Sequence, residues 1–128
     1  MKQMILPPPL KALLPQGIQG LCEGALFKRN ERVFQAGNKP TWMFYVVSGE
    51  VVLERTGLQG ESVVLQRTRQ GFISEASLKV AAYHCDAVAI TDTAVIKVPV
   101  KDIAKSLDND PAFANRWITM LNSEVRRL

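Results

Sequence analysis

The chain has 128 residues, 47% hydrophobic and 22% charged, with a net charge of +4. This length and composition predict one folded domain around one core and exclude a disordered segment. No apolar stretch approaches the ~20 residues of a membrane-spanning helix, and the prolines of residues 7–9 argue against a secretory signal. We therefore expect a cytoplasmic protein.

The residue inventory offers little support for a metal site or for catalysis. The chain has only two cysteines, Cys22 and Cys85, which is too few for a disulfide framework. We therefore expect free thiols in a reducing compartment. His84 is the only histidine, and its neighbour Cys85 would point to the opposite face of a strand. No catalytic triad, phosphate loop or carboxylate pair stands out. We expect a non-enzyme without metal or cofactor.

The first third of the chain is expected to be mostly irregular. Residues 1–9 form a loose arm, and Leu10–Leu14 a short helix that Pro15 and Gly17 end. Residues 18–27 contain two glycines that interrupt any period, so only one helical turn is expected there.

From Arg32 the pattern predicts strands separated by turns. Gly37 lies in a turn signal, and residues 57–60 read as a hairpin turn. In residues 62–68 the side chains alternate, with Val63 and Leu65 opposite Val64 and Gln66. Such short strands indicate a small antiparallel barrel or sandwich. The expected strands are 33–34, 42–47, 51–55, 62–68, 85–90 and 94–98.

Helical periodicity begins after Pro99. Residues 100–107 predict one helix, and Asp110 followed by Pro111 is a typical start for a second. The second helix carries one apolar stripe, which we interpret as either core or the seam of a dimer: Phe113, Trp117, Leu121, Val125 and Leu128. No cap follows it, so we expect the native protein to continue.

Four segments in a fixed order resemble one family. They are QAGNKP with Gly37, the block from Phe44 to Leu53 with its Ser-Gly pair, GFISEASL, and TDTAVIKVP. Together they resemble the sensory domain of bacterial Crp/Fnr-type transcription regulators. The resemblance implies a mainly β fold with flanking helices. It would be a cyclic-nucleotide-binding-like antiparallel β-barrel of jelly-roll type over residues 1–110, followed by a dimerisation helix from 111 to 128.

The segment GFISEASL resembles the family's phosphate-binding cassette. In family members that bind a cyclic nucleotide, backbone N–H groups and an arginine hold the phosphate, and a glutamate accepts a hydrogen bond from the ribose. Glu75 falls on the glutamate position, and Ser74 replaces the usual glycine before it. Tyr83 falls on the arginine position. The candidate ligand residues are Gly71, Ser74, Glu75, Ala76, Ser77, Tyr83 and His84.

Each candidate has a plainer interpretation. Glu75 could cap a short helix, and Tyr83 could be a core aromatic with its hydroxyl at the rim. Lys79 or His84 could partly replace the missing positive charge. The poor match at Tyr83 predicts weak binding of cyclic AMP and cyclic GMP, or none.

Two functions remain open. The first is a homodimeric sensor that binds an unknown small effector and relays it through the last helix to a DNA-binding domain absent from this chain. The scattered basic residues predict no DNA binding by the chain itself. The second is a stand-alone, degenerate module with an empty pocket. A cupin-type metal enzyme is a remote third, because it needs several histidines.

Overall fold

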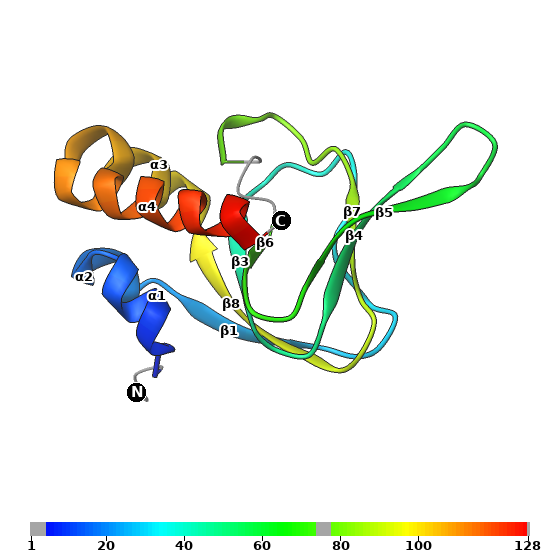
Figure 1. The fold of residues 1–128 in the computed structure, drawn as a ribbon, viewed down its shortest axis with the longest axis horizontal. Helices are drawn as coiled ribbons and strands as arrows, with labels where there is room; N and C mark the ends of the chain where they lie inside the picture. The colour runs from blue at the N-terminus through cyan, green and yellow to red at the C-terminus, as the bar shows by residue number, and fades with distance from the viewer. Residues whose placement is uncertain (1–4, 74–77, 128) are drawn as a thin grey trace.

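The fold consists of two four-stranded antiparallel sheets with helices gathered at one end (Figure 1). It is known here from a computed structural model, which describes residues 5–73 and 78–127 and, in the last helix, side chains up to Ser123. The first sheet has the order β1-β8-β3-β6 and the second β2-β7-β4-β5. This confirms the jelly-roll type of fold, although the hydrogen bonding does not close the two sheets into one continuous barrel.

Most predicted elements are found within two residues of their expected bounds. The first sheet contains β1 (Glu23–Phe27), β8 (Thr93–Pro99), β3 (Trp42–Ser48) and β6 (Gly71–Ile73). The second contains β2 (Arg32–Phe34), β7 (Asp86–Ala89), β4 (Val51–Thr56) and β5 (Ser62–Thr68). The helices are α1 (Pro8–Leu13), α2 (Gln16–Gln19), α3 (Val100–Asn109) and α4 (Pro111–Arg127).

The prediction for residues 18–27 was wrong in part. A short helix does occur, as α2, but residues 23–27 form β1, which pairs with β8 from Glu23 opposite Lys97 to Phe27 opposite Thr93. Gly24 conceals this strand in the sequence, and pairing with a neighbour supplies what local propensity lacks. A strand was missed for the same reason at β6, where Gly71 opens three residues that pair with β3.

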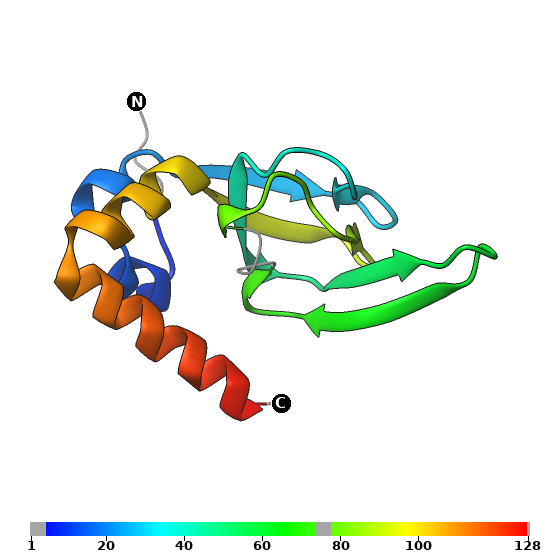
Figure 2. The same cartoon turned by 90° about the horizontal axis from the view of Figure 1, so that it is seen from above.

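The alternation predicted for β5 does not produce one buried face. Val63, Val64 and Leu65 are 53%, 45% and 51% exposed. The cause is topological, because β5 is an edge strand and the β4–β5 hairpin projects from the body of the molecule (Figures 1 and 2). Gly57 N–H donates to the Glu61 carbonyl at 2.7 Å, so the hairpin turn itself is confirmed.

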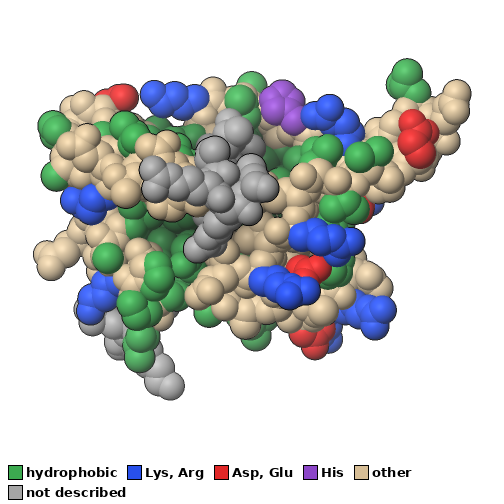
Figure 3. All heavy atoms as spheres, viewed as in Figure 1, with side chains coloured by type: hydrophobic (Ala, Val, Ile, Leu, Met, Phe, Trp, Pro, Cys, Tyr) green, Lys and Arg blue, Asp and Glu red, His purple; other side chains and the backbone are tan. Residues whose placement is uncertain are grey.

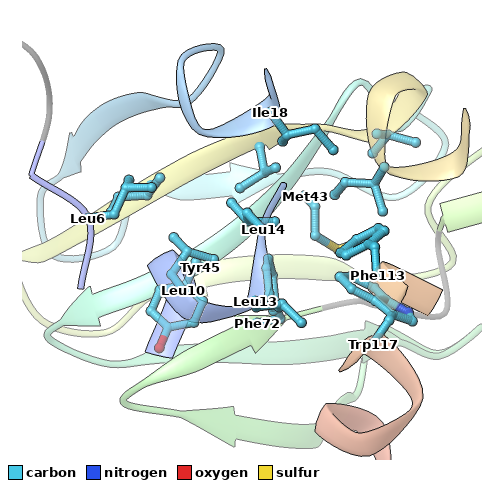
Figure 4. Packing of buried hydrophobic residues seen from close by; sticks show 14 residues of the cluster. Leu6, Leu10, Leu13, Leu14, Ile18, Met43, Tyr45, Phe72, Phe113 and Trp117 are labelled. Carbon is cyan, nitrogen blue, oxygen red and sulfur yellow. The ribbon is translucent and has the colours of Figure 1, made fainter. Parts of the chain in front are cut away.

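The core has two parts, one on each face of the first sheet. The between-sheet cluster includes Phe34, Phe44, Ile73 and Tyr83. The helix-side cluster joins the outer face of the first sheet to the helices; its members include Leu10, Leu13, Met43, Tyr45, Phe72, Ile103, Phe113 and Trp117 (Figure 4). Alternation along β6 separates the two, since Phe72 faces the helices and its neighbour Ile73 faces the second sheet.

Candidate functional site

The cassette-like segment begins on β6 and returns to the second sheet at β7. Gly71 adopts a φ of 110°, a conformation that favours glycine, and so sets the turn into β6. Four of the candidates, Ser74, Glu75, Ala76 and Ser77, lie outside the described residues. Their predicted ligand contacts, and the alternative helix cap at Glu75, therefore stay predictions.

Tyr83 lies in the between-sheet cluster with 5% of its surface exposed. Its ring stacks on Phe34, with centroids 3.9 Å apart and planes within 10°. Its hydroxyl donates a hydrogen bond to the Trp42 carbonyl oxygen at 3.0 Å. Burial raises the pKa of this hydroxyl to about 12, so it stays neutral. Tyr83 is thus a core aromatic residue, as the plainer interpretation proposed. Its role in ligand binding stays a prediction.

The backbone of Tyr83 is also held. Its N–H donates to the Asn38 carbonyl, and its own carbonyl accepts from Gly37 N–H, each at 2.9 Å. Gly37 has a φ of 91°, as its predicted turn requires. Two backbone hydrogen bonds from the segment QAGNKP therefore fix the backbone of Tyr83, the residue that aligns with the family's arginine.

The two residues considered as partial replacements for the missing positive charge, Lys79 and His84, lie at the surface. Lys79 is exposed, and its Nζ lies 3.8 Å from Asp108 Oδ1 on α3. His84 is exposed, whereas Cys85 is half-buried and burial raises the pKa of its thiol. Cys22 is half-buried too, and burial raises its pKa to about 11. Neither thiol is activated as a nucleophile.

The stripe on α4 is divided between two environments. Phe113 and Trp117 are 0% and 5% exposed within the single chain, where Trp117 contacts Phe72 with ring centroids 5.4 Å apart (Figure 4). The core alternative therefore holds for these two residues, and they have no free surface for a second chain. Leu121 is half-buried against the same cluster. The side chain of Val125, and Leu128 as a whole, lie outside the described part.

Asp110 caps α4 as predicted. Its carboxylate accepts a hydrogen bond from the Phe113 N–H at 3.1 Å, while its own N–H donates to the Ser106 carbonyl and closes α3. One residue thus ends one helix and starts the next, and the chain reverses direction between α3 and α4 (Figure 2).

A hollow lies where α4 passes α1 and the first sheet. It has a volume of about 560 Å³, and Leu13, Phe72 and Met120 are among its lining residues. Arg116 and Thr119 of α4 contribute polar atoms to its wall. Sequence patterning did not single out this pocket, because its walls come from four separate parts of the chain and Arg116 is one of many scattered basic residues.

The Ser48-Gly49 motif has a steric cause. Gly49 has a φ of 90°, and a Cβ there would lie 2.5 Å from both the Asp92 carbonyl oxygen and Thr93 Oγ1. The turn between β3 and β4 thus packs directly on the turn before β8. The segments containing Ser48-Gly49 and Thr91-Asp92, which both contribute to the resemblance, are therefore in contact in the fold, and the contact requires a glycine.

Comparison with known proteins agrees with this arrangement. The family model "Cyclic nucleotide-binding domain" matches residues 25–110, more than half of the chain. The chain belongs to this family. No curated protein matches the sequence significantly.

Several of the solved structures that match this fold are Crp/Fnr-type transcription regulators or their sensor domains, which confirms the resemblance. The sensor domain of the regulator DNR from Pseudomonas aeruginosa is 19% identical with a TM-score of 0.76; the match covers 93% of this chain and 83% of that one. The catabolite activator protein of Thermus thermophilus is 25% identical with a TM-score of 0.70, covering 93% and 59%. The c-di-GMP-responsive regulator CLP of Xanthomonas campestris is 15% identical with a TM-score of 0.73, covering 83% and 53%.

The surface charges of this cyclic-nucleotide-binding-family domain form local pairs rather than a stripe. Glu50 accepts hydrogen bonds from Arg69 Nε at 2.6 Å and Arg67 at 3.0 Å, and the Arg69 bond is the main reason that its pKa is lowered. Basic side chains are dispersed over the face in Figure 3. In the described part, no helix could span a membrane and no group of three or more His, Cys, Asp or Glu could hold a metal ion.

Proposed function

We propose that this chain is the sensory domain of a Crp/Fnr-type transcription regulator that does not use a cyclic nucleotide held by the usual phosphate–arginine pair. The observation that carries the proposal is the placement of Tyr83. A neutral tyrosine, stacked on Phe34 and bonded to the Trp42 carbonyl, stands where the arginine would align. Without a guanidinium there, a buried phosphate loses its charge-assisted partner.

The expected cost of that loss is large enough to measure. A charge-assisted hydrogen bond contributes on the order of 1.5–3 kcal/mol, which is roughly ten- to a hundredfold in affinity. Lys79 is directed to Asp108 and His84 is exposed, so neither is placed as an obvious substitute. The similarity of fold to a regulator described as c-di-GMP-responsive supports the view that this scaffold serves more than one effector.

Titration calorimetry of this chain with cyclic AMP and cyclic GMP tests the proposal directly. We expect no binding, or dissociation constants well above the micromolar range. A low-micromolar constant for either nucleotide would contradict the proposal and the alignment of Tyr83 on which it rests.

The proposed relay runs through α4. A ligand shifts an equilibrium only by its difference in affinity for two states, so an effector should contact α4 or the elements that hold it. DNA binding would reside in a further domain outside this chain. In a gel-shift assay at moderate salt, the longer native protein should bind duplex DNA sequence-specifically, whereas this chain should show at most weak, salt-sensitive binding.

We also propose homodimerisation through the surface of α4 that the domain leaves uncovered. Ile118 is 54% exposed, and Leu121 lies at the edge of the helix-side cluster. Replacing Leu121 and Val125 by Asp should shift the native protein toward monomer in sedimentation. A matched change at Leu58, which is fully exposed on the distant hairpin, should leave the sedimentation coefficient unchanged. An unaltered dimer in the double variant would contradict this interface.

The second candidate is a domain of the same fold that binds no effector. The tight packing around Tyr83 disfavours a cyclic nucleotide, and it equally favours a domain that binds no effector on that face. A ligand-binding pocket elsewhere in the domain would decide between the two.

A further inference from the structure

We propose that the hollow between α1, the first sheet and α4 is a binding site for a small apolar carboxylate. This inference names a ligand class for the proposed sensor, and to that extent rests on the proposed function. The binding itself is argued from the pocket alone.

The pocket lies on the helix side of the first sheet. Tyr45 and Phe72, which line the pocket, belong to the helix-side cluster, whereas Tyr83 belongs to the between-sheet cluster. The pocket and the position aligned with the family's arginine therefore lie on opposite faces of the first sheet. A ligand here would not need the space that Tyr83 and Phe34 fill.

The size and the lining of the pocket suit a small apolar ligand. A volume of about 560 Å³ lies within the usual range for small-molecule sites. One part of the wall is apolar, formed by Pro9, Ala12 and Leu13 from the first helix together with Phe72 and Met120. Such a wall suits a hydrocarbon chain or ring and disfavours a strongly hydrated ligand.

The pocket has a positive charge at its wall. Arg116 is half-buried at the pocket wall, and within the described residues it takes part in none of the ion pairs. The pocket's described lining contains no Asp or Glu. An arginine that has no acidic partner in the described part of the chain, and that lies beside an apolar cavity, favours an anionic head group, and its planar fork matches a carboxylate.

Arg116 is also held in place before any ligand arrives. Its Nε donates to the Leu13 carbonyl at 3.0 Å, and its guanidinium carbon lies 5.8 Å from the centre of the Phe113 ring. These contacts leave the two terminal amino groups of the guanidinium for another acceptor. Thr119, one helical turn further along α4, adds a hydroxyl to the same wall, although that hydroxyl now donates to the Asn115 carbonyl.

Titration of this chain with decanoate, and with decanol as its neutral counterpart, tests the site. We expect saturable binding of decanoate at one site and about tenfold weaker binding of decanol, because only the carboxylate pairs with Arg116. The Arg116→Gln variant should lose about tenfold for decanoate and little for decanol, and Arg116→Lys should restore part of the difference. Equal affinity for the two ligands in the unmodified chain would overturn the assignment of Arg116.

A second pair of variants tests the pocket without changing Arg116, whose substitution could disturb the fold. Thr119→Trp would fill the pocket from an exposed helix position and should abolish binding of both ligands. Ala112→Trp adds the same side chain at an exposed position of α4 outside the lining and should leave binding unchanged. No saturable binding in the unmodified chain, or decanoate binding that survives Thr119→Trp, would overturn the proposal.

One more outcome would assign the pocket to another occupant. If Thr119→Trp dissociates a dimer while decanoate binding is unchanged, the pocket is a protein contact and the proposal fails. Failure of the sensor function is separately visible. In that case decanoate binds this chain with the expected dependence on Arg116 but leaves DNA binding by the longer protein unaltered.

Discussion

The two faces of the first sheet differ in how fully their polar groups are paired within the described part of the domain. On the between-sheet face, Tyr83 is stacked, and its hydroxyl and backbone groups all have partners inside the domain. On the helix-side face, Arg116 is positioned by two contacts but has no acidic partner among the described residues. Satisfied polar groups make a face structural, while a positioned and unpaired charge leaves it available to a ligand. The pocket beside α4 is therefore a better candidate for a ligand site than the closed surroundings of Tyr83.

The largest expected effect tests whether α4 is part of the domain core. Phe113→Ala removes a ring that is fully buried against Trp117, so the free energy of unfolding should fall by about 3–5 kcal/mol. Leu58→Ala removes apolar atoms that are fully exposed and should change it by less than about 0.5 kcal/mol. Urea unfolding curves at equal protein concentration make the comparison. A loss below about 1 kcal/mol for Phe113→Ala would mean that α4 does not pack here in solution.

Tyr83→Arg should show the next largest effect. A guanidinium at this position loses the stack on Phe34 and enters a nearly closed environment, so unfolding should become easier by about 3 kcal/mol. Restoring the family's residue is therefore expected to weaken the fold rather than to create cyclic AMP binding. Thermal unfolding with and without cyclic AMP provides the measurement.

The conservative change at the same position calibrates that result. Tyr83→Phe keeps the ring and removes only the hydroxyl bond to the Trp42 carbonyl, which should cost about 1 kcal/mol. A stable Tyr83→Arg protein that binds cyclic AMP would show that the between-sheet face can accept a ligand. It would contradict the difference drawn between the two faces.

The smallest expected effect concerns the surface ion pairs that Glu50 makes with Arg67 and Arg69. Arg69 and Arg67 lower the pKa of Glu50 from its ordinary 4.5, so the folded state prefers the ionised carboxylate. The resulting stability is present above pH 4.5 and is lost as the pH falls through the lowered value. In Glu50→Gln the melting temperature should be slightly lower at neutral pH and should depend less on acid. Glu61→Gln, at the exposed hairpin turn, serves as the control; an unchanged acid profile in Glu50→Gln would contradict this pairing.

Local chemistry in the sequence predicted the elements that carry their own signals. The start of α4 follows from Asp110 and Pro111, because a side-chain cap and a fixed φ act over a few residues. The Ser-Gly pair at Gly49 predicted a turn and contributed to the resemblance, although its contact with Thr93 is tertiary. The strands β3, β4, β5, β7 and β8 were predictable from β-prone residues between turn signals.

Only the tertiary structure decided the rest. β1 and β6 exist because β8 and β3 offer them partners, which no local propensity encodes. Periodicity showed that α4 has an apolar stripe but not what covers it, and the packing of Phe113 and Trp117 on Phe72 gives that answer. The pocket beside Arg116 joins α1, β3, β6 and α4, segments that are distant in the chain. The sequence alone therefore determined the family and most elements. The burial of Tyr83 and the position of Arg116 follow from long-range packing, because the environment of a side chain depends on contacts that the local pattern does not contain.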